Sequence, residues 1–262
     1  MSSIREVLEA GDPAFMPFAV AGYPDKRRSE RIVGALVDSG ADVIEIGIPF
    51  SDPMADGPTI VEADEKALNE GFSTEDAFDL ASGFRGVPVV LMAYANTIHA
   101  YGYRRFLSDA EAAGADGLIV PDMPPEEFQR ELGHVETSLD IVFLITQNTP
   151  DDRIGSIADA TSGFAYLVSV AGTTGARNHL KTQVSDVLGK TEDVDVPRCV
   201  GFGISGPETA RMAVREGSDG VIVGSALIDA YADGGLNGLR DLATDLAEAV
   251  HTTKTTDGET QL

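Results

Sequence analysis

Two carboxylates in the first quarter of the chain have the surroundings that acid and base catalysis requires. Glu45 stands inside the apolar run Val43–Ile46, whose β-branched residues predict a buried strand. An unpaired charge in such a strand is costly, unless burial raises its pKa until the group is neutral. Asp56 follows eleven residues later in a loop, and two acids in such different surroundings can act as general acid and general base. The alternative is a core glutamate with hydrogen-bond partners beside an ordinary Asp-rich turn.

The segment that joins the two acids is expected to hold one fixed path. Gly47–Pro58 contains three prolines and two glycines within twelve residues. Proline fixes φ and glycine permits unusual φ values, so a loop rich in both is restricted to a particular conformation. This loop would keep Asp56 in a defined position relative to Glu45.

The elements that must position these residues alternate between strand and helix. Eight short apolar runs are expected to be strands, and a segment with helical spacing of apolar residues follows each. Several intervals between strands are about 25 residues, as an alternating β/α chain requires. Ser3, Ser29, Ser73 and Ser205 are expected to begin helices. The expected strands are residues 17–21, 43–47, 87–92, 115–120, 141–145, 164–168, 198–202 and 220–223.

Eight β/α units in 262 residues predict a single-domain (β/α)8 barrel, the TIM-barrel fold. The barrel is expected to occupy residues 1–251, with an N-terminal helix before the first strand and an extra short helix after the eighth. Residues 252–262 lack an apolar pattern and are expected to form a disordered tail. A doubly wound open sheet is the alternative. It usually carries a glycine fingerprint after its first strand, where this chain has Ala21-Gly22-Tyr23-Pro24.

The ends of the last two strands could hold an anion. Gly201–Gly203 ends the seventh strand, and Gly224-Ser225 ends the eighth and opens a short helix. Free N–H groups and the positive end of the helix dipole attract anions at a helix start, and these two loops often bind phosphate in this fold. Either motif alone is more often a plain turn, but the two together favour a phosphorylated substrate. Gly172–Gly175 after the sixth strand would add a lid, unless it is an ordinary surface loop.

Composition disfavours several classes of partner. The chain has 43 acidic and 19 basic residues, and its net charge of −24 argues against nucleic acid and anionic membranes as partners. No apolar run approaches the ~20 residues of a membrane span, and the N-terminus lacks the layout of a signal peptide. With a single cysteine, Cys199, which is expected in the core, the chain is expected to be cytoplasmic. Only five basic residues are lysine, which favours a high-salt cytoplasm over ordinary conditions.

The remaining polar residues narrow the chemistry. The four histidines show no metal-ligand spacing, so no metal site is expected. No lysine stands at the carboxyl end of an expected strand, where a Schiff-base aldolase would need one. A carboxylate pair and a phosphate site, without metal or Schiff base, indicate acid–base lyase or isomerase chemistry. Phe18 and Tyr94 lie at strand ends and could line an aromatic pocket, although a core position is the default for each.

The run IEIGIPFSDPMADGPTI at residues 44–60 closely resembles the signature of the tryptophan synthase alpha chain family, here as an acidic, haloarchaeal-type member. The resemblance implies a (β/α)8 barrel that cleaves indole-3-glycerol phosphate to indole and glyceraldehyde 3-phosphate by a retro-aldol step without a cofactor. It also implies a beta chain, carrying pyridoxal phosphate, that receives indole through a tunnel in an α2β2 tetramer. Further matches follow in the family's order at Pro17-Phe18, Tyr94–Asn96, Val120–Pro124, Gly172–Gly175, Gly201–Ser205 and Gly224–Ala226.

The resemblance also assigns roles to individual residues. Asp56 takes or stabilises the indole N–H proton, while Glu45 protonates indole C3 and assists at the glycerol hydroxyl. Thr174 matches a lid threonine that meets the catalytic aspartate when the lid closes. The other substrate-binding residues that it implies are Phe18, Tyr94 and Phe202 around the indole, and Gly175, Gly203, Gly224 and Ser225 around the phosphate.

One position departs from the family pattern, and two other interpretations stay open. Many members carry an arginine in the lid where this chain has Val170, which affects lid closure and signalling to the partner but not the acid pair. The chain could be another phosphosugar lyase or isomerase of this fold, although an indole-glycerol phosphate synthase would need a catalytic lysine. It could also be a non-catalytic regulatory subunit that binds a phosphorylated ligand, although binding alone requires neither Glu45 nor Asp56.

Overall fold

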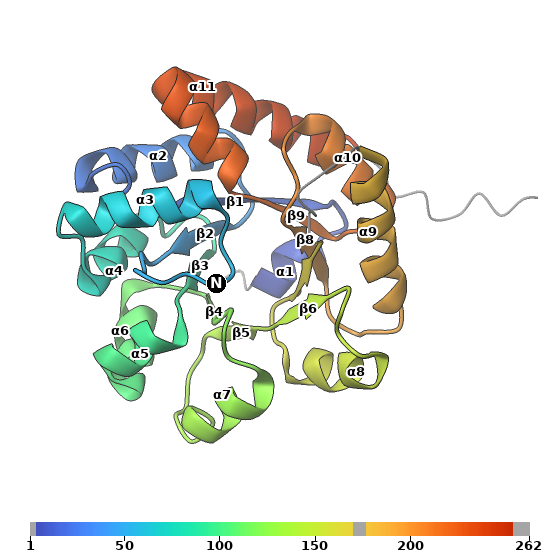
Figure 1. Cartoon of the computed structure of the whole chain (residues 1–262), viewed down its shortest axis with the longest axis horizontal. Helices are drawn as coiled ribbons and strands as arrows, with labels where there is room; N and C mark the ends of the chain where they lie inside the picture. The colour runs from blue at the N-terminus through green and yellow to red at the C-terminus, as the bar shows by residue number, and fades with distance from the viewer. Residues whose placement is uncertain (1–3, 170–176, 254–262) are drawn as a thin grey trace, which may run out of the picture.

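The computed structural model describes residues 4–169 and 177–253, in which short parallel strands alternate with helices (Figure 1). Every predicted strand has a counterpart in the structure, with ends that differ by a few residues. The fifth predicted strand is divided in two. The strands are β1 (Ala14–Val20), β2 (Ile44–Gly47), β3 (Val89–Met92), β4 (Gly117–Ile119), β5 (Asp140–Val142), β6 (Leu144–Thr146), β7 (Ala165–Val168), β8 (Arg198–Gly201) and β9 (Gly220–Val223).

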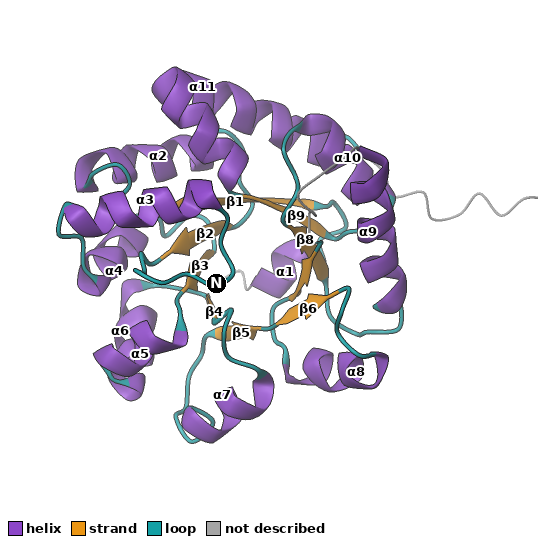
Figure 2. Ribbon diagram, in the orientation of Figure 1, coloured by secondary structure: helices purple, strands orange, loops and turns teal. Residues whose placement is uncertain are grey.

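The strands form one parallel sheet in the order β5-β4-β3-β2-β1-β9-β8-β7-β6. Its two end strands belong to the same stretch of chain, because only Phe143 separates β5 from β6. β5 pairs with β4 and β6 pairs with β7, so this stretch joins the two ends of the sheet and closes the barrel. Figure 2 shows the resulting ring of strands inside a ring of helices. The predicted (β/α)8 barrel is confirmed, with its fifth strand changing partners at Phe143.

Helices cover the outside of the barrel, and every predicted helical segment has a counterpart. The short helix α5, between the third and fourth predicted strands, was not expected as a separate element. Helix α11 bends at Gly235, where φ is 60°, so it contains both the predicted extra helix after the last strand and the helix that follows it. The helices are α1 (Ile4–Leu8), α2 (Lys26–Asp38), α3 (Pro58–Asn69), α4 (Thr74–Ser82), α5 (Ala95–Tyr101), α6 (Tyr103–Ala113), α7 (Pro125–Glu131), α8 (Asp151–Ala160), α9 (Arg177–Lys190), α10 (Pro207–Arg215) and α11 (Ser225–His251).

The serines predicted to begin helices have different outcomes. Ser73 is the N-cap of α4, where its hydroxyl accepts the Asp76 N–H at 3.2 Å and the Asp76 carboxylate accepts the Ser73 N–H at 3.0 Å. The prediction for Ser29 is wrong, because α2 begins three residues earlier behind the N-cap Asp25. Ser29 is buried inside α2, and its hydroxyl accepts the N–H of Gly22 at 3.0 Å. A tertiary donor has therefore taken the hydroxyl that the sequence pattern assigned to a cap.

The start of α10 is a second correction. Its first residue is Pro207 and its N-cap is Gly206, so Ser205 lies outside the helix. Thr209 provides the polar group instead, because its hydroxyl accepts the N–H of Ser205 at 3.0 Å and of Gly206 at 3.1 Å. Ser3 lies outside the described residues.

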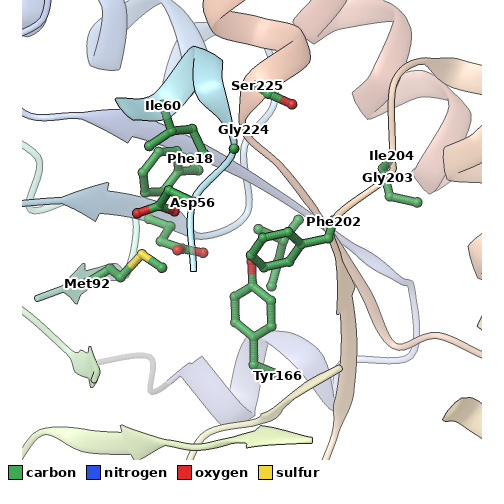
Figure 3. Close-up of a pocket in the computed structure, with 13 residues that line it drawn as sticks. Phe18, Asp56, Ile60, Met92, Tyr166, Phe202, Gly203, Ile204, Gly224 and Ser225 are labelled. Carbon is green, nitrogen blue, oxygen red and sulfur yellow. The ribbon is translucent and has the colours of Figure 1, made fainter. Parts of the chain in front are cut away.

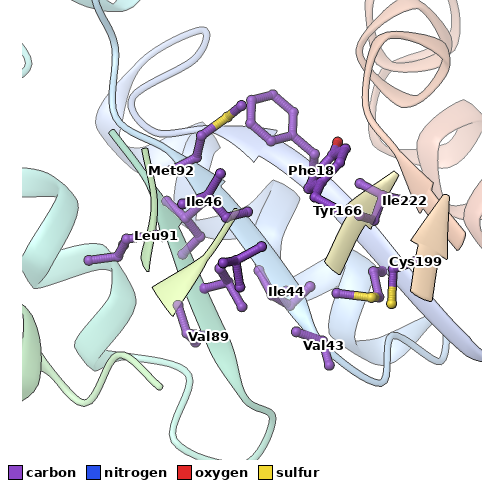
Figure 4. Packing of buried hydrophobic residues seen from close by; sticks show 14 of the residues in the cluster. Phe18, Val43, Ile44, Ile46, Val89, Leu91, Met92, Tyr166, Cys199 and Ile222 are labelled. Atoms are coloured by element: carbon purple, nitrogen blue, oxygen red, sulfur yellow. The ribbon is translucent and has the colours of Figure 1, made fainter. Parts of the chain in front are cut away.

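Apolar side chains fill the interior of the barrel. Because helices cover the outer face of a parallel sheet, its strands are buried on both sides and consist of nearly continuous apolar residues. Figure 4 shows part of this buried cluster, which includes Ile46 of β2, its register partner Leu91 of β3, and Cys199 of β8. A carboxylate inside β2 is therefore an exception to the packing around it.

Helix α1 packs against the amino-terminal ends of the strands. Ile4 is fully buried and lies against β4, where a Cβ added to Gly117 would be 2.8 Å from the Ile4 Cδ1 atom. Closure of this end leaves the opposite end, where the strands terminate, as the open end of the barrel. None of the helices in residues 4–169 and 177–253 has the length and apolar character that a membrane span requires.

Candidate active site

A pocket lies at the carboxyl-terminal ends of the strands and contains most of the residues that the sequence singled out (Figure 3). Active sites of (β/α)8 barrels occur at this end. Seven of the ten predicted site residues line the pocket, and they come from four different strands or the loops after them. These seven are Phe18, Glu45, Asp56, Phe202, Gly203, Gly224 and Ser225.

Glu45 is buried in β2 without a hydrogen-bond partner. Its exposed fraction is 1%, and neither carboxylate oxygen has a partner among the described residues. Burial, and secondly the charge of Asp56, raise the pKa of Glu45 from its usual value of 4.5 to about 8. The carboxyl group is therefore mostly protonated at neutral pH and can donate a proton, as expected for an acid in an apolar strand.

Asp56 faces the same pocket from the loop after β2, in a more polar environment. The Tyr94 hydroxyl donates a hydrogen bond to its Oδ2 atom at 2.7 Å, while its Oδ1 atom is buried without a partner among the described residues. Burial raises the pKa of Asp56, and the hydrogen bond from Tyr94 opposes that rise. Asp56 thus has a donor that stabilises its charged form, which Glu45 lacks, and the two acids differ as acid/base catalysis requires.

Tyr94 supports the loop that carries Asp56. Besides donating to Asp56, its hydroxyl accepts the N–H of Ala55 at 3.1 Å. Its ring stacks on Phe50, with centroids 5.0 Å apart and planes inclined by 23°. Tyr94 is 4% exposed and is not among the residues that line the pocket, so its contact with the site runs through Asp56.

Aromatic rings form one part of the pocket wall, and glycines at strand ends make room for them. The strand register pairs Phe18 of β1 with Glu45 of β2, so the ring lies beside the buried acid. A Cβ at Gly47 would be 2.6 Å from the Phe18 ring, and a Cβ at Gly201 would overlap the hydroxyl of Tyr166. Larger residues at these two positions would displace the rings from the pocket.

The chain turns sharply where Phe202 and Gly203 enter the pocket. Phe202 has a φ of 68°, which is rare for a residue with a side chain, and Gly203 follows with a φ of 75°. The buried Ser169 holds this turn, because its hydroxyl lies within hydrogen-bonding distance of two carbonyl oxygens to which it can donate. These are the oxygens of Gly201, at 3.2 Å, and Phe202, at 2.8 Å. The strained backbone places the Phe202 ring against Tyr166, with ring centroids 6.1 Å apart.

The other part of the pocket is suited to an anion. Gly203, Gly224 and Ser225 line it together, and α11 begins at Ser225 with Gly224 as its N-cap. The free N–H groups of this first turn and the positive end of the helix dipole attract negative charge. The predicted lid residues Thr174 and Gly175, and the divergent Val170, lie outside the described residues.

The sequence profile of the family described as "Tryptophan synthase alpha chain" matches residues 4–257. The chain belongs to the tryptophan synthase alpha chain family. It is 46% identical over 228 residues to the tryptophan synthase alpha chain of Citrifermentans bemidjiense, covering 84% of each chain. It is 41% identical over 255 residues to that of Picosynechococcus, covering 94% of this chain and 97% of the relative.

Solved structures agree with the family membership. A chain of Mycobacterium tuberculosis tryptophan synthase superposes with a TM-score of 0.87 at 37% identity, covering 95% of this chain and 98% of that one. The alpha subunit of tryptophan synthase from Legionella pneumophila superposes with a TM-score of 0.85 at 36% identity, with the same coverage. These comparisons confirm three predictions from the sequence: the family to which the chain belongs, the TIM-barrel fold, and lyase activity in tryptophan biosynthesis.

Several residues that line the pocket were not predicted. Tyr166 had a detectable signal, because a tyrosine in an otherwise apolar barrel strand brings a hydroxyl that needs a polar neighbour. The others are apolar residues or a glycine that look like ordinary core or loop positions. They are Gly57, Ile60, Met92, Ile204 and Ile222. Within the described residues, no three His, Cys, Asp or Glu side chains gather as metal ligands would.

Proposed function

We propose that this chain cleaves indole-3-glycerol phosphate to indole and glyceraldehyde 3-phosphate, with Glu45 and Asp56 as its catalytic residues. The observation that carries the proposal is the buried Glu45, which has no hydrogen-bond partner among the described residues. It lies beside Asp56 in a pocket with aromatic rings at one part and a helix start at another, and its pKa is raised. The aromatic rings suit the indole, and the helix start suits the phosphate.

The reaction needs a proton at indole C3 before the carbon–carbon bond can break, because the indole ring is a poor carbanion leaving group. Glu45 donates that proton, and Asp56 accepts or stabilises the N–H proton of the ring as positive charge develops there. The hydroxyl on the glycerol carbon attached to C3 then loses its proton to Glu45, and its electrons form the aldehyde. The bond to C3 breaks with its electrons returning to the ring, and the ring nitrogen regains any proton held by Asp56. Glu45 is thereby protonated again, and the step consumes no cofactor.

We expect the phosphate to bind at Gly203, Gly224 and Ser225, with Gly175 as a further contact. Thr174 would meet Asp56 when the lid closes. Ser225→Ala is the cleanest test of this placement. A Cβ added at Gly224 would lie 3.0 Å from the Phe18 ring, so Gly224→Val would disturb the aromatic wall as well. Ser225→Ala removes only a hydroxyl, and we expect it to raise KM for the substrate while the affinity for free indole stays unchanged.

The partners of this chain follow from the same proposal. A beta chain that carries pyridoxal phosphate would receive the indole through a tunnel, in an α2β2 heterotetramer in the cytoplasm. Many family members carry an arginine where this chain has Val170. We therefore expect lid closure, and the signalling from the lid to the beta chain, to differ from those of members with the arginine. The net charge of −24 and the low lysine content support a high-salt cytoplasm as the setting.

Indole release from indole-3-glycerol phosphate tests the proposal, measured with and without a tryptophan synthase beta chain. Asp56→Asn should lose about 10²–10⁴-fold in kcat. Asp52→Asn is the matched control, because Asp52 lies four residues away in the same loop and is exposed. Binding of the substrate without indole release by the wild-type protein would favour a non-catalytic phospholigand-binding subunit instead. Equal losses in the two variants would show that the loop conformation, and not the acid, had been measured.

A further inference from the structure

A third carboxyl group is buried near Asp56, and the proposed reaction does not use it. Asp64 lies in α3, the helix that follows the loop of Asp56, and is only 4% exposed. The acids closest to it along the helix, Glu62 and Glu65, are exposed. An aspartate is almost never buried in this way unless it has a specific partner.

Asp64 has such a partner at the other end of the loop. Its carboxyl group lies close to the backbone N–H of Phe50, which opposes the rise in the pKa of Asp64. The ring of Phe50 stacks on Tyr94, and the Tyr94 hydroxyl donates to Asp56. A continuous series of contacts therefore runs from Asp64 through Phe50 and Tyr94 to the catalytic aspartate.

We propose that Asp64 is a positioning residue, which fixes Phe50 so that Tyr94 and the loop hold Asp56 in place beside Glu45. The proposal rests on the catalytic role of Asp56 given above. Asp64 anchors the first part of the loop at Phe50, and Tyr94 anchors the last part at the Ala55 N–H and the Asp56 carboxylate. The two anchors are joined by the stacked rings, so release of the first is transmitted to the second.

The charge state of Asp64 suits this role. Burial, and secondly the charge of Asp56, raise the pKa of Asp64 to about 8, whereas the Phe50 N–H opposes the rise. A neutral carboxyl group at pH 7 still accepts the Phe50 N–H through its carbonyl oxygen. It adds no second negative charge beside Asp56, which would otherwise favour protonation of the catalytic acid.

Two substitutions at Asp64 separate positioning from catalysis. Asp64→Asn keeps an uncharged oxygen acceptor for the Phe50 N–H, whereas Asp64→Leu keeps the branched shape, in a somewhat larger side chain, and removes the acceptor. In the indole-release assay we expect Asp64→Asn to stay within threefold of the wild-type kcat. Asp64→Leu should lose at least tenfold in kcat while KM changes less than threefold, because small displacements of a catalytic group reduce the rate strongly. Glu65→Leu, on the exposed face of the same helix, is the control and should match the wild type.

Hydrogen–deuterium exchange of the peptide spanning residues 48–57 gives a readout that does not depend on activity. Exchange in this loop should be faster in Asp64→Leu than in the wild type and unchanged in Asp64→Asn. Phe50→Leu removes the stacked ring without touching Asp64. Phe50→Leu should show the same loss of kcat as Asp64→Leu. It therefore tests the proposal even if Asp64→Leu folds poorly.

Each alternative has its own result. Loss of kcat in Asp64→Asn as large as in Asp56→Asn would make Asp64 a catalytic acid and overturn the positioning role. Normal kcat and normal loop exchange in Asp64→Leu would overturn the proposal altogether. A wild-type protein that releases no indole would refute the proposed function, while the exchange data would still decide whether Asp64 holds the loop.

Discussion

The acids at the two ends of the barrel differ in what they touch. At the amino-terminal ends of the strands, three half-buried aspartates each accept a backbone N–H at 2.7–2.9 Å. At the carboxyl-terminal ends, both oxygens of Glu45 and one oxygen of Asp56 have no partner among the described residues. In the three hydrogen bonds at the amino-terminal ends, the N–H of Phe15 donates to Asp42, that of Val89 to Asp116 and that of Arg198 to Asp219.

This difference separates the structural acids from the two acids proposed to be catalytic. Each amino-end aspartate comes just before a strand and ties it to the beginning of another, so its hydrogen bond contributes to the closed barrel. Within residues 4–169 and 177–253, the Glu45 carboxyl group binds no other group and is held by the packing of β2, which leaves its proton available to a substrate. An unpaired buried carboxyl group is costly to the fold, and that cost is typical of functional sites.

The largest effect is expected from Glu45→Gln. The amide has the same shape but cannot donate the catalytic proton, so kcat should fall about 10²–10⁴-fold while the fold and phosphate binding are retained. The matched variant at the other end is Asp116→Asn, which keeps an oxygen to accept the Val89 N–H and should keep normal kcat. Single-turnover indole release measures both. If kcat of Glu45→Gln were within threefold of the wild-type value, Glu45 would not be the catalytic acid, and the acids at the two ends of the barrel would not differ in function.

The pH dependence of stability should show the same contrast. Between the usual pKa of 4.5 and the folded-state pKa of about 8, the native protein holds a proton on Glu45 that the unfolded chain has released. Stability therefore falls as pH rises through this interval, by up to about 3 kcal/mol at pH 7, and Glu45→Gln should remove this contribution. Urea unfolding at pH 5, 6, 7 and 8 measures it. A stability difference between the two proteins that is constant over this range would show that Glu45 titrates normally.

Replacing an aspartate at the amino-terminal ends of the strands should lower stability without lowering kcat, which is the opposite of what is expected for Glu45. Asp116→Ala leaves the Val89 N–H without its acceptor, so the free energy of unfolding should fall by about 1–3 kcal/mol. The kcat per folded molecule should not change, because Asp116 lies at the end of the barrel away from the pocket. Chemical unfolding and active-site titration of the same preparation separate the two quantities. Reduced kcat at unchanged stability would mean that this end also influences the reaction.

Much of this arrangement was predictable from the sequence, because the physical signals were local. A parallel barrel strand is apolar on both faces, so the single acid in β2 was conspicuous at Glu45. The glycines and prolines after β2 identified a shaped loop, and the paired glycine motifs identified the end that suits an anion. The eight-strand alternation predicted the barrel, and only the break at Phe143 was missed, because a change of pairing partner leaves no mark on composition.

The parts that escaped prediction depend on tertiary contacts. Asp64 looks like any polar residue of an exposed helix face, and only folding brings it to the Phe50 N–H. Tyr94 was expected in the aromatic wall, but its hydroxyl reaches Asp56 from behind the loop. Ser29 fits a helix cap by type, yet the nearby Gly22 N–H takes its hydroxyl. In each case a donor or acceptor from another helix or loop decided the role of the side chain.

The acids on the surface form a third group, and salt should act on them more than on the acids in the pocket. Of the changes considered, salt should therefore have the smallest effect on the chemical step. The 43 acidic residues exceed the 19 basic ones, and their mutual repulsion weakens as the Debye length falls from ~10 Å at 0.1 M to ~3 Å at 1 M salt. Tm should therefore rise between 0.1 and 1 M KCl, and a further rise at 3 M would indicate ion and hydration effects beyond screening. Glu45 is buried and Asp56 is partly buried, so the pair is less accessible to these ions than the surface acids are, and activity should follow the folded fraction alone. Melting curves and kcat at 0.1, 1 and 3 M KCl test both statements. A flat Tm would remove the high-salt interpretation, and a kcat that changes while the protein stays folded would show that the acid pair senses the solvent.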